Sequence, residues 1–140
     1  MNVNIKTISS SEDMISFGQE LGNSLKGGEI IELIGDVGAG KTTFTKGLAK
    51  SLGITDEIQS PTFTISRVYE GAKNNLVHYD FYRLNDAGIM AIEMQDVIDD
   101  PNNITVIEWG EPVREVLPKK YITVKIKIIS ENIREVEWSR

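Results

Sequence analysis

The stretch GDVGAGKTT, from Gly35 to Thr43, decides the predicted fold because it matches the phosphate-binding pattern G-x-x-x-x-G-K-[ST]. A short apolar run rich in β-branched residues comes before it, at 29–34, and is typical of a buried strand. A helical pattern follows, with apolar residues every four positions from Phe44 to Leu52 and a glycine directly after them. A strand, a glycine-rich loop and a helix in this order predict a P-loop.

Each residue type in this loop has a chemical use at a phosphate. Glycines allow positive φ values and bring backbone N–H groups against a phosphate, and the positive end of the following helix points at the same place. The Lys41 ammonium suits the β and γ phosphates, the Thr42 hydroxyl is placed to coordinate Mg2+, and Thr43 is in position for an α-phosphate. The residues expected to bind a nucleoside triphosphate in the loop are Asp36, Gly38, Ala39, Gly40, Lys41, Thr42 and Thr43.

The composition favours one domain and disfavours direct binding to nucleic acid. A length of 140 residues suits a single core, so 1–140 is treated as one domain. The net charge is −6 and no run of Lys or Arg is longer than the pair Lys119-Lys120, so a basic stripe for an RNA backbone is lacking. There is no cysteine, and the N-terminus shows no apolar segment of signal-peptide or membrane length. We expect a cytoplasmic protein with no membrane contact.

Alternating and helical patterns predict the other elements. A helix with an apolar stripe from Met14 to Leu25 is expected, capped by Ser9 or Ser10, and a second at 85–103 is expected to be capped by Asn85 or Asp86. Strands are predicted within 2–9, 55–71, 76–84, 104–111, 121–130 and 134–139, with the second and third joined as a hairpin. These elements predict a three-layer α/β P-loop NTPase fold with a mixed, partly antiparallel central sheet.

Two acids are candidates for the second half of the site, because each lies at or near the end of a predicted strand. The carboxyl ends of strands face the ligand in an open α/β sheet, so both acids are expected there. Asp80 suits the magnesium side, and a carboxylate at Glu108 could polarise an attacking water. The alternatives are a strand-end acid that caps a neighbouring helix for Asp80, and an ion pair with Lys or Arg at the rim for Glu108.

Three further features are more ambiguous. Ser60 and Thr62 flank a proline in QSPTF, where either a switch-like segment or ordinary turn chemistry fits. His78, the only histidine, is more typical of a packing residue than of a base. Trp109, directly after Glu108, is either a core residue or an exposed stacking surface.

Four sequence blocks together resemble the TsaE family, formerly YjeE, of ATPases in bacterial tRNA threonylcarbamoyladenosine biosynthesis. The blocks are GDVGAGKTTFTKGLAKSLG, SPTF, HYDFYRL and IEWGE, and the similarity covers nearly the whole chain. The resemblance implies a small ATPase, weak alone, that uses ATP and Mg2+. It also implies partners of the TsaB and TsaD type, which transfer a threonylcarbamoyl group to an adenosine beside the tRNA anticodon, and contact with tRNA only through that complex.

The resemblance also assigns roles to residues, position by position. It gives catalytic roles to Glu108, Asp80 and Lys41, and places Thr42, Asp80 and Glu108 on the magnesium side. It adds Ser60, Thr62 and Trp109 to the nucleotide-binding residues. The segment Gly88–Val97 departs from the family pattern of an acidic pair, a glycine and a short acidic stretch, so the local helix ending and any partner contact there stay open.

Two other functions fit a P-loop. A small-molecule kinase would need an acceptor pocket and usually several arginines, and the chain has only Arg67, Arg83 and Arg114 between the loop and the last strands. A nucleotide-dependent binding switch specific for guanine would need an Asn-Lys-x-Asp segment, which the sequence lacks. The sequence therefore favours an ATPase over both.

Overall fold

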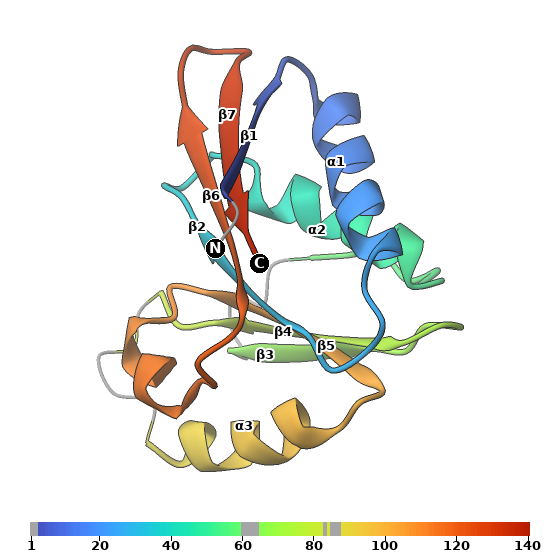
Figure 1. The fold of residues 1–140 in the computed structure, drawn as a ribbon, viewed down its shortest axis with the longest axis vertical. Coiled ribbons are helices and arrows are strands. Elements are labelled where there is room, and N and C mark those ends of the chain that lie inside the picture. The colour runs from blue at the N-terminus through green and yellow to red at the C-terminus, as the bar shows by residue number, and fades with distance from the viewer. Residues whose placement is uncertain (1–2, 60–64, 83, 85–87) are drawn as a thin grey trace.

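The computed structural model describes residues 3–59, 65–82, 84 and 88–140, which form one seven-stranded sheet with helices on both faces (Figure 1). The strands are β1 (Val3–Ile8), β2 (Ile30–Ile34), β3 (Ser66–Tyr69), β4 (Asn75–Asp80), β5 (Asn103–Glu108), β6 (Ile122–Ile128) and β7 (Arg134–Ser139). Their order is β1-β7-β6-β2-β5-β4-β3. The neighbours β6, β2, β5 and β4 are parallel, and the pairings toward both edges are antiparallel. The predicted mixed sheet is confirmed.

The helices form the two outer layers. α1 (Ser11–Asn23) and α2 (Lys41–Ser51) cover one face of the sheet, and α3 (Ile89–Asp99) with the 3₁₀ helix η1 (Glu111–Val116) covers the other (Figure 1). Buried side chains alternate along β2, so that Ile31 and Leu33 join the core under α1 and α2, while Ile30 joins the core under α3. The predicted three layers are confirmed. Within the described residues, no helix has the length and apolar character needed to cross a bilayer.

Local signals set the ends of the helices that flank the loop. The Ser10 side chain accepts a hydrogen bond from the backbone N–H of Asp13, at 3.1 Å, and caps α1 as predicted. After α2 the chain turns at Gly53, which has a φ of 76° that suits glycine. The Ile54 N–H then donates to the carbonyl of Ala49 at 3.1 Å, which closes the last turn of the helix.

Other boundaries differ from the expectation. α3 begins at Ile89, after Gly88 with a φ of 54°, which is later than the cap predicted at Asn85 or Asp86; those two residues lie outside the described part of the chain. β3 lies within the stretch 55–71 where a strand was predicted, and residues 60–64 of that stretch are outside the described part of the chain. The sequence signal before α3 was ambiguous, since polar and small residues there fit either a cap or a turn.

Glycines bring α1 and α2 into direct backbone contact. A Cβ added at Gly47 would lie 2.0 Å from the Ile15 carbonyl oxygen, and one added at Gly18 would lie 2.3 Å from that of Phe44. Neither position has room for a methyl group, because the obstacle is backbone rather than a flexible side chain. The start of α2, and with it the phosphate loop, is therefore held against α1.

We expect Gly47→Ala to destabilise the fold by about 1–3 kcal/mol, the usual cost of overpacking, although alanine has the higher helix propensity. Chemical denaturation measures the change in the free energy of unfolding. Lys46→Ala, at the exposed neighbouring position, is the control and should change it by less than about 0.5 kcal/mol. A Gly47→Ala protein as stable as the parent would show that the two helices can separate without cost.

Candidate nucleotide-binding site

The carboxyl ends of three neighbouring parallel strands meet at one edge of the sheet. β2 ends in the glycine-rich loop, β4 ends at Asp80 and β5 ends at Glu108. Asp80 and Glu108 are opposite each other in the parallel pairing of β4 with β5, and the alternation of the strands puts both on the face covered by α2. The two acids predicted from the sequence are therefore brought together beside the loop.

The loop has a conformation suited to an anion. Gly38 and Gly40 have φ values of 85° and 113°, and the Ala39 N–H donates to the Asp36 carbonyl at 3.0 Å to form a tight turn. Gly40 precedes α2, which has no side-chain cap and no acidic residue in its first turn. The first N–H groups of α2 have no intrahelical partners, so they are available to a phosphate, together with the positive end of the helix dipole.

Lys41 is the first residue of α2, and its ammonium group is buried between the loop and the end of β5. Nζ donates to the carbonyl oxygen of Gly35 at 2.8 Å and lies 3.6 Å from Oε1 of Glu108. It also lies 4.2 Å from the centre of the Trp109 ring. Only 8% of the lysine side chain is exposed, so the ion pair to Glu108 compensates for burying the positive charge.

Glu108 is buried as well, and its second oxygen has a different partner. Oε2 contacts Nε2 of His78 at 2.5 Å, and the His78 side chain is fully buried. His78 is opposite Val106, two residues before Glu108, so the two side chains meet diagonally on one face of neighbouring strands. The sequence gave no signal for this contact, because it depends on the order and register of β4 and β5.

Asp80 and Trp109 complete the cluster at this edge. Oδ1 of Asp80 accepts a hydrogen bond from the Tyr82 N–H at 3.0 Å, which orders the chain after β4. Trp109 is half-buried, has a φ of 55°, and has its ring centre 4.8 Å from that of Tyr82. Asp80 thus combines a turn-forming contact with a place beside Glu108, and Trp109 lies neither in the core nor fully in solvent.

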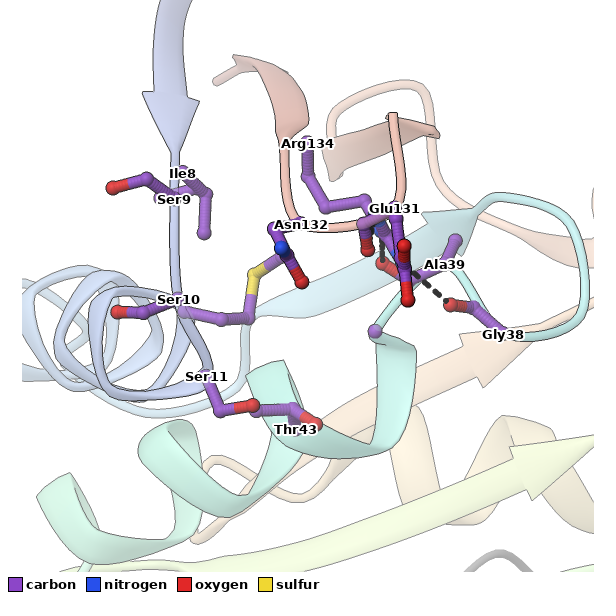
Figure 2. A pocket seen from close by; sticks show the side chains of 12 residues that line it. Ile8, Ser9, Ser10, Ser11, Gly38, Ala39, Thr43, Glu131, Asn132 and Arg134 are labelled. Atoms are coloured by element: carbon purple, nitrogen blue, oxygen red, sulfur yellow. Dashed lines mark hydrogen bonds between the residues drawn. The ribbon is translucent and has the colours of Figure 1, made fainter. Parts of the chain in front are cut away.

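A pocket of about 210 Å³ opens beside the loop, where it faces the β6–β7 turn (Figure 2). It is lined by the loop, by Ser9, Ser10 and Ser11 at the start of α1, and by Glu131, Asn132 and Arg134 around the turn between β6 and β7. The Arg134 guanidinium donates to the carbonyls of Ala39 at 3.1 Å and Gly38 at 3.3 Å (Figure 2). It also donates to the Ser130 carbonyl at 2.7 Å. Arg134 therefore ties the β6–β7 turn to the loop, a role that the sequence pattern did not reveal.

An ion pair under the other face of the sheet fixes the segment that follows Trp109. The buried Glu32 of β2 accepts two hydrogen bonds from the guanidinium of Arg114 in η1, at 2.9 and 3.1 Å. This hydrogen bonding raises the pKa of Arg114 above its usual value. One of the three arginines between the loop and the last strands is thus paired with Glu32.

The structure gathers most of the predicted site residues at one place. The loop from Asp36 to Thr43 lies between the pocket and a cluster at the ends of β4 and β5. This cluster consists of Lys41, Asp80, Glu108 and Trp109. Ser60 and Thr62 fall outside the described residues, so their predicted roles stay predictions. His78 and Arg134 are the additions that only the three-dimensional arrangement supplies.

Comparisons with known proteins agree with this geometry. The family model "Threonylcarbamoyl adenosine biosynthesis protein TsaE" matches residues 8–136. The chain belongs to the TsaE family. It is 39% identical over 128 residues to the TsaE protein of Treponema pallidum, and the matched region covers 91% of this chain and 93% of that protein. It is 37% identical over 135 residues to that of Aquifex aeolicus, covering 95% and 93%.

A solved structure is similar over almost the whole chain. The crystal structure of YdiB from Bacillus subtilis superposes with a TM-score of 0.81 at 29% sequence identity and covers 98% of this chain and 84% of that one. The TsaE match includes both strands that carry the acids and the whole glycine-rich loop. The predicted family and fold are therefore confirmed.

In this TsaE-family chain we expect Arg134→Gln to weaken nucleotide binding by about tenfold, since two hydrogen bonds that fix the loop are lost at roughly 0.5–1.5 kcal/mol each. Isothermal titration calorimetry with ATP measures the change. Arg140→Gln is the control, because Arg140 is exposed beyond the other end of β7 and donates to Ser24. Equal affinities for both variants would mean that the loop keeps its shape without Arg134.

Proposed function

We propose that this chain is a Mg2+-dependent ATPase that supports threonylcarbamoyladenosine modification of tRNA by acting on proteins of the TsaB and TsaD type. The observation that supports the ATPase most directly is the contact of Lys41 with both the glycine-rich loop and Glu108. A P-loop lysine and a strand-end acid at one sheet edge are the groups that phosphoryl transfer to water requires. Membership of the TsaE family supports the biological process.

We propose that ATP would bind in the loop and the adjoining pocket. The N–H groups at the start of α2 and the Lys41 ammonium would bind the phosphates, with Thr43 beside them. The pocket next to the loop, between the serines at the start of α1 and the β6–β7 turn, would receive the nucleoside. Arg134 joins the two parts, because it holds the loop and belongs to the pocket wall.

Magnesium would be held by few protein groups. Thr42 follows the P-loop lysine, where a hydroxyl coordinates Mg2+ in this motif. Asp80 is the carboxylate that the family resemblance assigns to the magnesium side. In the described part of the chain, no three His, Cys, Asp or Glu side chains gather to hold a metal. Mg2+ is usually bound by one or two protein oxygens together with phosphates and water, so this donor set fits. The ion would neutralise charge that develops on the phosphates.

Glu108 is proposed as the base for hydrolysis. The oxygen of a water molecule would bond to the γ phosphorus, and the bond from that phosphorus to the β–γ bridging oxygen would break with its electron pair remaining on ADP. The proton of the water would pass to the Glu108 carboxylate. Because Glu108 is buried and paired with Lys41, the lysine has to give up this contact before the carboxylate can meet water.

The weak intrinsic activity expected for the family fits such a paired state. We propose that TsaB and TsaD type proteins complete the cycle and that tRNA is reached only through them, in the cytoplasm. A net charge of −6 supports this indirect route, because binding to RNA gains from releasing counterions only where a protein presents many cations. Ser60 and Thr62 are kept as proposed switch residues on the family resemblance.

The alternatives are separated by simple measurements. A guanine-nucleotide switch would bind GTP more tightly than ATP, and calorimetry with both nucleotides compares the two affinities. A small-molecule kinase would transfer the phosphate to an acceptor, and a screen of nucleosides and sugars detects that transfer. The commitment of Arg114 to Glu32 disfavours the kinase, because it removes one of few arginines near the loop.

We expect Lys41→Ala and Glu108→Ala to separate binding from chemistry. Lys41→Ala should abolish useful ATP binding, because the cation aimed at the β and γ phosphates is lost. Glu108→Ala should still bind ATP but lower turnover by about a hundredfold or more, the scale of a positioned general base. Calorimetry and phosphate release measure the two effects. Unchanged ATP affinity in Lys41→Ala would remove the proposed site, and unchanged turnover in Glu108→Ala would reassign the base.

We also expect the isolated chain to bind bare tRNA only feebly at physiological salt and to bind partner proteins in a manner that depends on ATP or ADP. A gel-shift titration against tRNA tests the first expectation. Pull-downs with TsaB and TsaD type proteins, in ATP or ADP, test the second, with Lys41→Ala as the control that should not respond to nucleotide. Tight binding to bare tRNA, or partner binding indifferent to nucleotide, would contradict this mechanism.

A further inference from the structure

The side chain of the fully buried His78 has one polar contact in the described structure, and that contact is with the proposed base. Its Nε2 meets Oε2 of Glu108, while Nδ1 has no partner among the described residues. We propose that His78 is a positioning residue for hydrolysis, which holds Oε2 of Glu108 so that Oε1 is the oxygen that receives the proton of water. This inference rests on the proposed ATPase function.

The geometry assigns the direction of the hydrogen bond. Oε1 of Glu108 lies 3.6 Å from the Lys41 ammonium, so the carboxylate is the anionic member of this pair and can only accept. His78 must then donate through Nε2–H, which leaves Nδ1 as the bare nitrogen, buried and with no partner among the described residues. An unpaired acceptor there costs less than an unpaired N–H together with a second buried charge.

The two oxygens of Glu108 consequently have different uses. Oε2 is directed toward the buried His78 and away from solvent. Oε1 is directed toward Lys41, which also contacts the glycine-rich loop through Gly35. When Lys41 turns to a phosphate, only Oε1 loses its partner, and the carboxylate does not rotate because His78 still holds Oε2. A base that is already held in one orientation loses less conformational entropy in reaching the transition state.

A double-mutant cycle tests this role. Under single-turnover conditions, with protein in excess over ATP, His78→Phe should lower the hydrolysis rate by about tenfold to a hundredfold, the usual loss when a supporting hydrogen bond is removed. His78→Gln, which keeps a donor near the same place, should recover most of that rate. In a Glu108→Gln background, His78→Phe should cause no further loss, because its effect passes through the carboxylate.

A matched control separates positioning from packing. Leu76→Ala removes buried methyl groups from the same strand and face, but Leu76 is opposite Ile104, four positions from Glu108 along β5. It should leave the single-turnover rate within about threefold of the parent, and His78→Phe should leave ATP affinity within about threefold. A rate loss in Leu76→Ala equal to that in His78→Phe, or losses that add in the Glu108→Gln background, would overturn the proposal.

A spectroscopic readout tests the hydrogen bond without activity. Because His78 is the only histidine, ¹⁵N-labelled histidine gives a single imidazole spectrum. We expect a slowly exchanging proton on Nε2, shifted downfield, that remains when a non-hydrolysable ATP analogue and Mg2+ are added and moves upfield in Glu108→Ala. A proton on Nδ1, or a shift unaffected by Glu108→Ala, would overturn the inference. Failure of the ATPase function would appear differently, as a parent protein without any ATP hydrolysis in the presence of its partners.

Discussion

The buried ion pair between Lys41 and Glu108 is the interaction on which the site depends. It joins the first residue of α2 to the last residue of β5, and it neutralises two charges that would each be costly to bury alone. Removing one member leaves the other without compensation, so both are constrained by stability as well as by chemistry. The Lys41 ammonium is directed at the loop but is already paired with Glu108, so the ATPase cycle proposed above would require it to leave that carboxylate first.

The strand order of the sheet brings Lys41 and Glu108 to the same point. β2 lies between β6 and β5, so the loop after β2 has Glu108 on one side and the β6–β7 turn on the other. The close contacts at Gly18 and Gly47 hold α2 against α1. Arg134, at the start of β7, holds the loop through its hydrogen bond to the Ala39 carbonyl.

Local patterns predicted a large part of this arrangement. The strand, loop and helix around Gly35–Thr43, the Ser10 cap and the turn at Gly53 follow from short-range rules of propensity and capping, and all occur as expected. The contacts of His78 and Arg134 could not be predicted, because they join residues 30 and 95 positions apart and require the strand order and register. The start of α3 was misplaced because Asn85, Asp86 and Gly88 all precede it, and each of these residue types can cap a helix.

Trp109 links the buried pair to the surface. Its positive φ is unfavourable for a bulky side chain by about 1–3 kcal/mol, and such strain persists only where the surroundings hold it. Here the Lys41 ammonium and the Tyr82 ring contact the indole, so the charge that pairs with Glu108 also stabilises the strained residue. Beyond Gly110, the Arg114–Glu32 pair fixes η1 to β2. If Lys41 moved toward a phosphate, Trp109 would lose its contact with the ammonium, while the Arg114–Glu32 pair would still hold η1. The conformational change would then be limited to the half-exposed Trp109 side chain beside the loop.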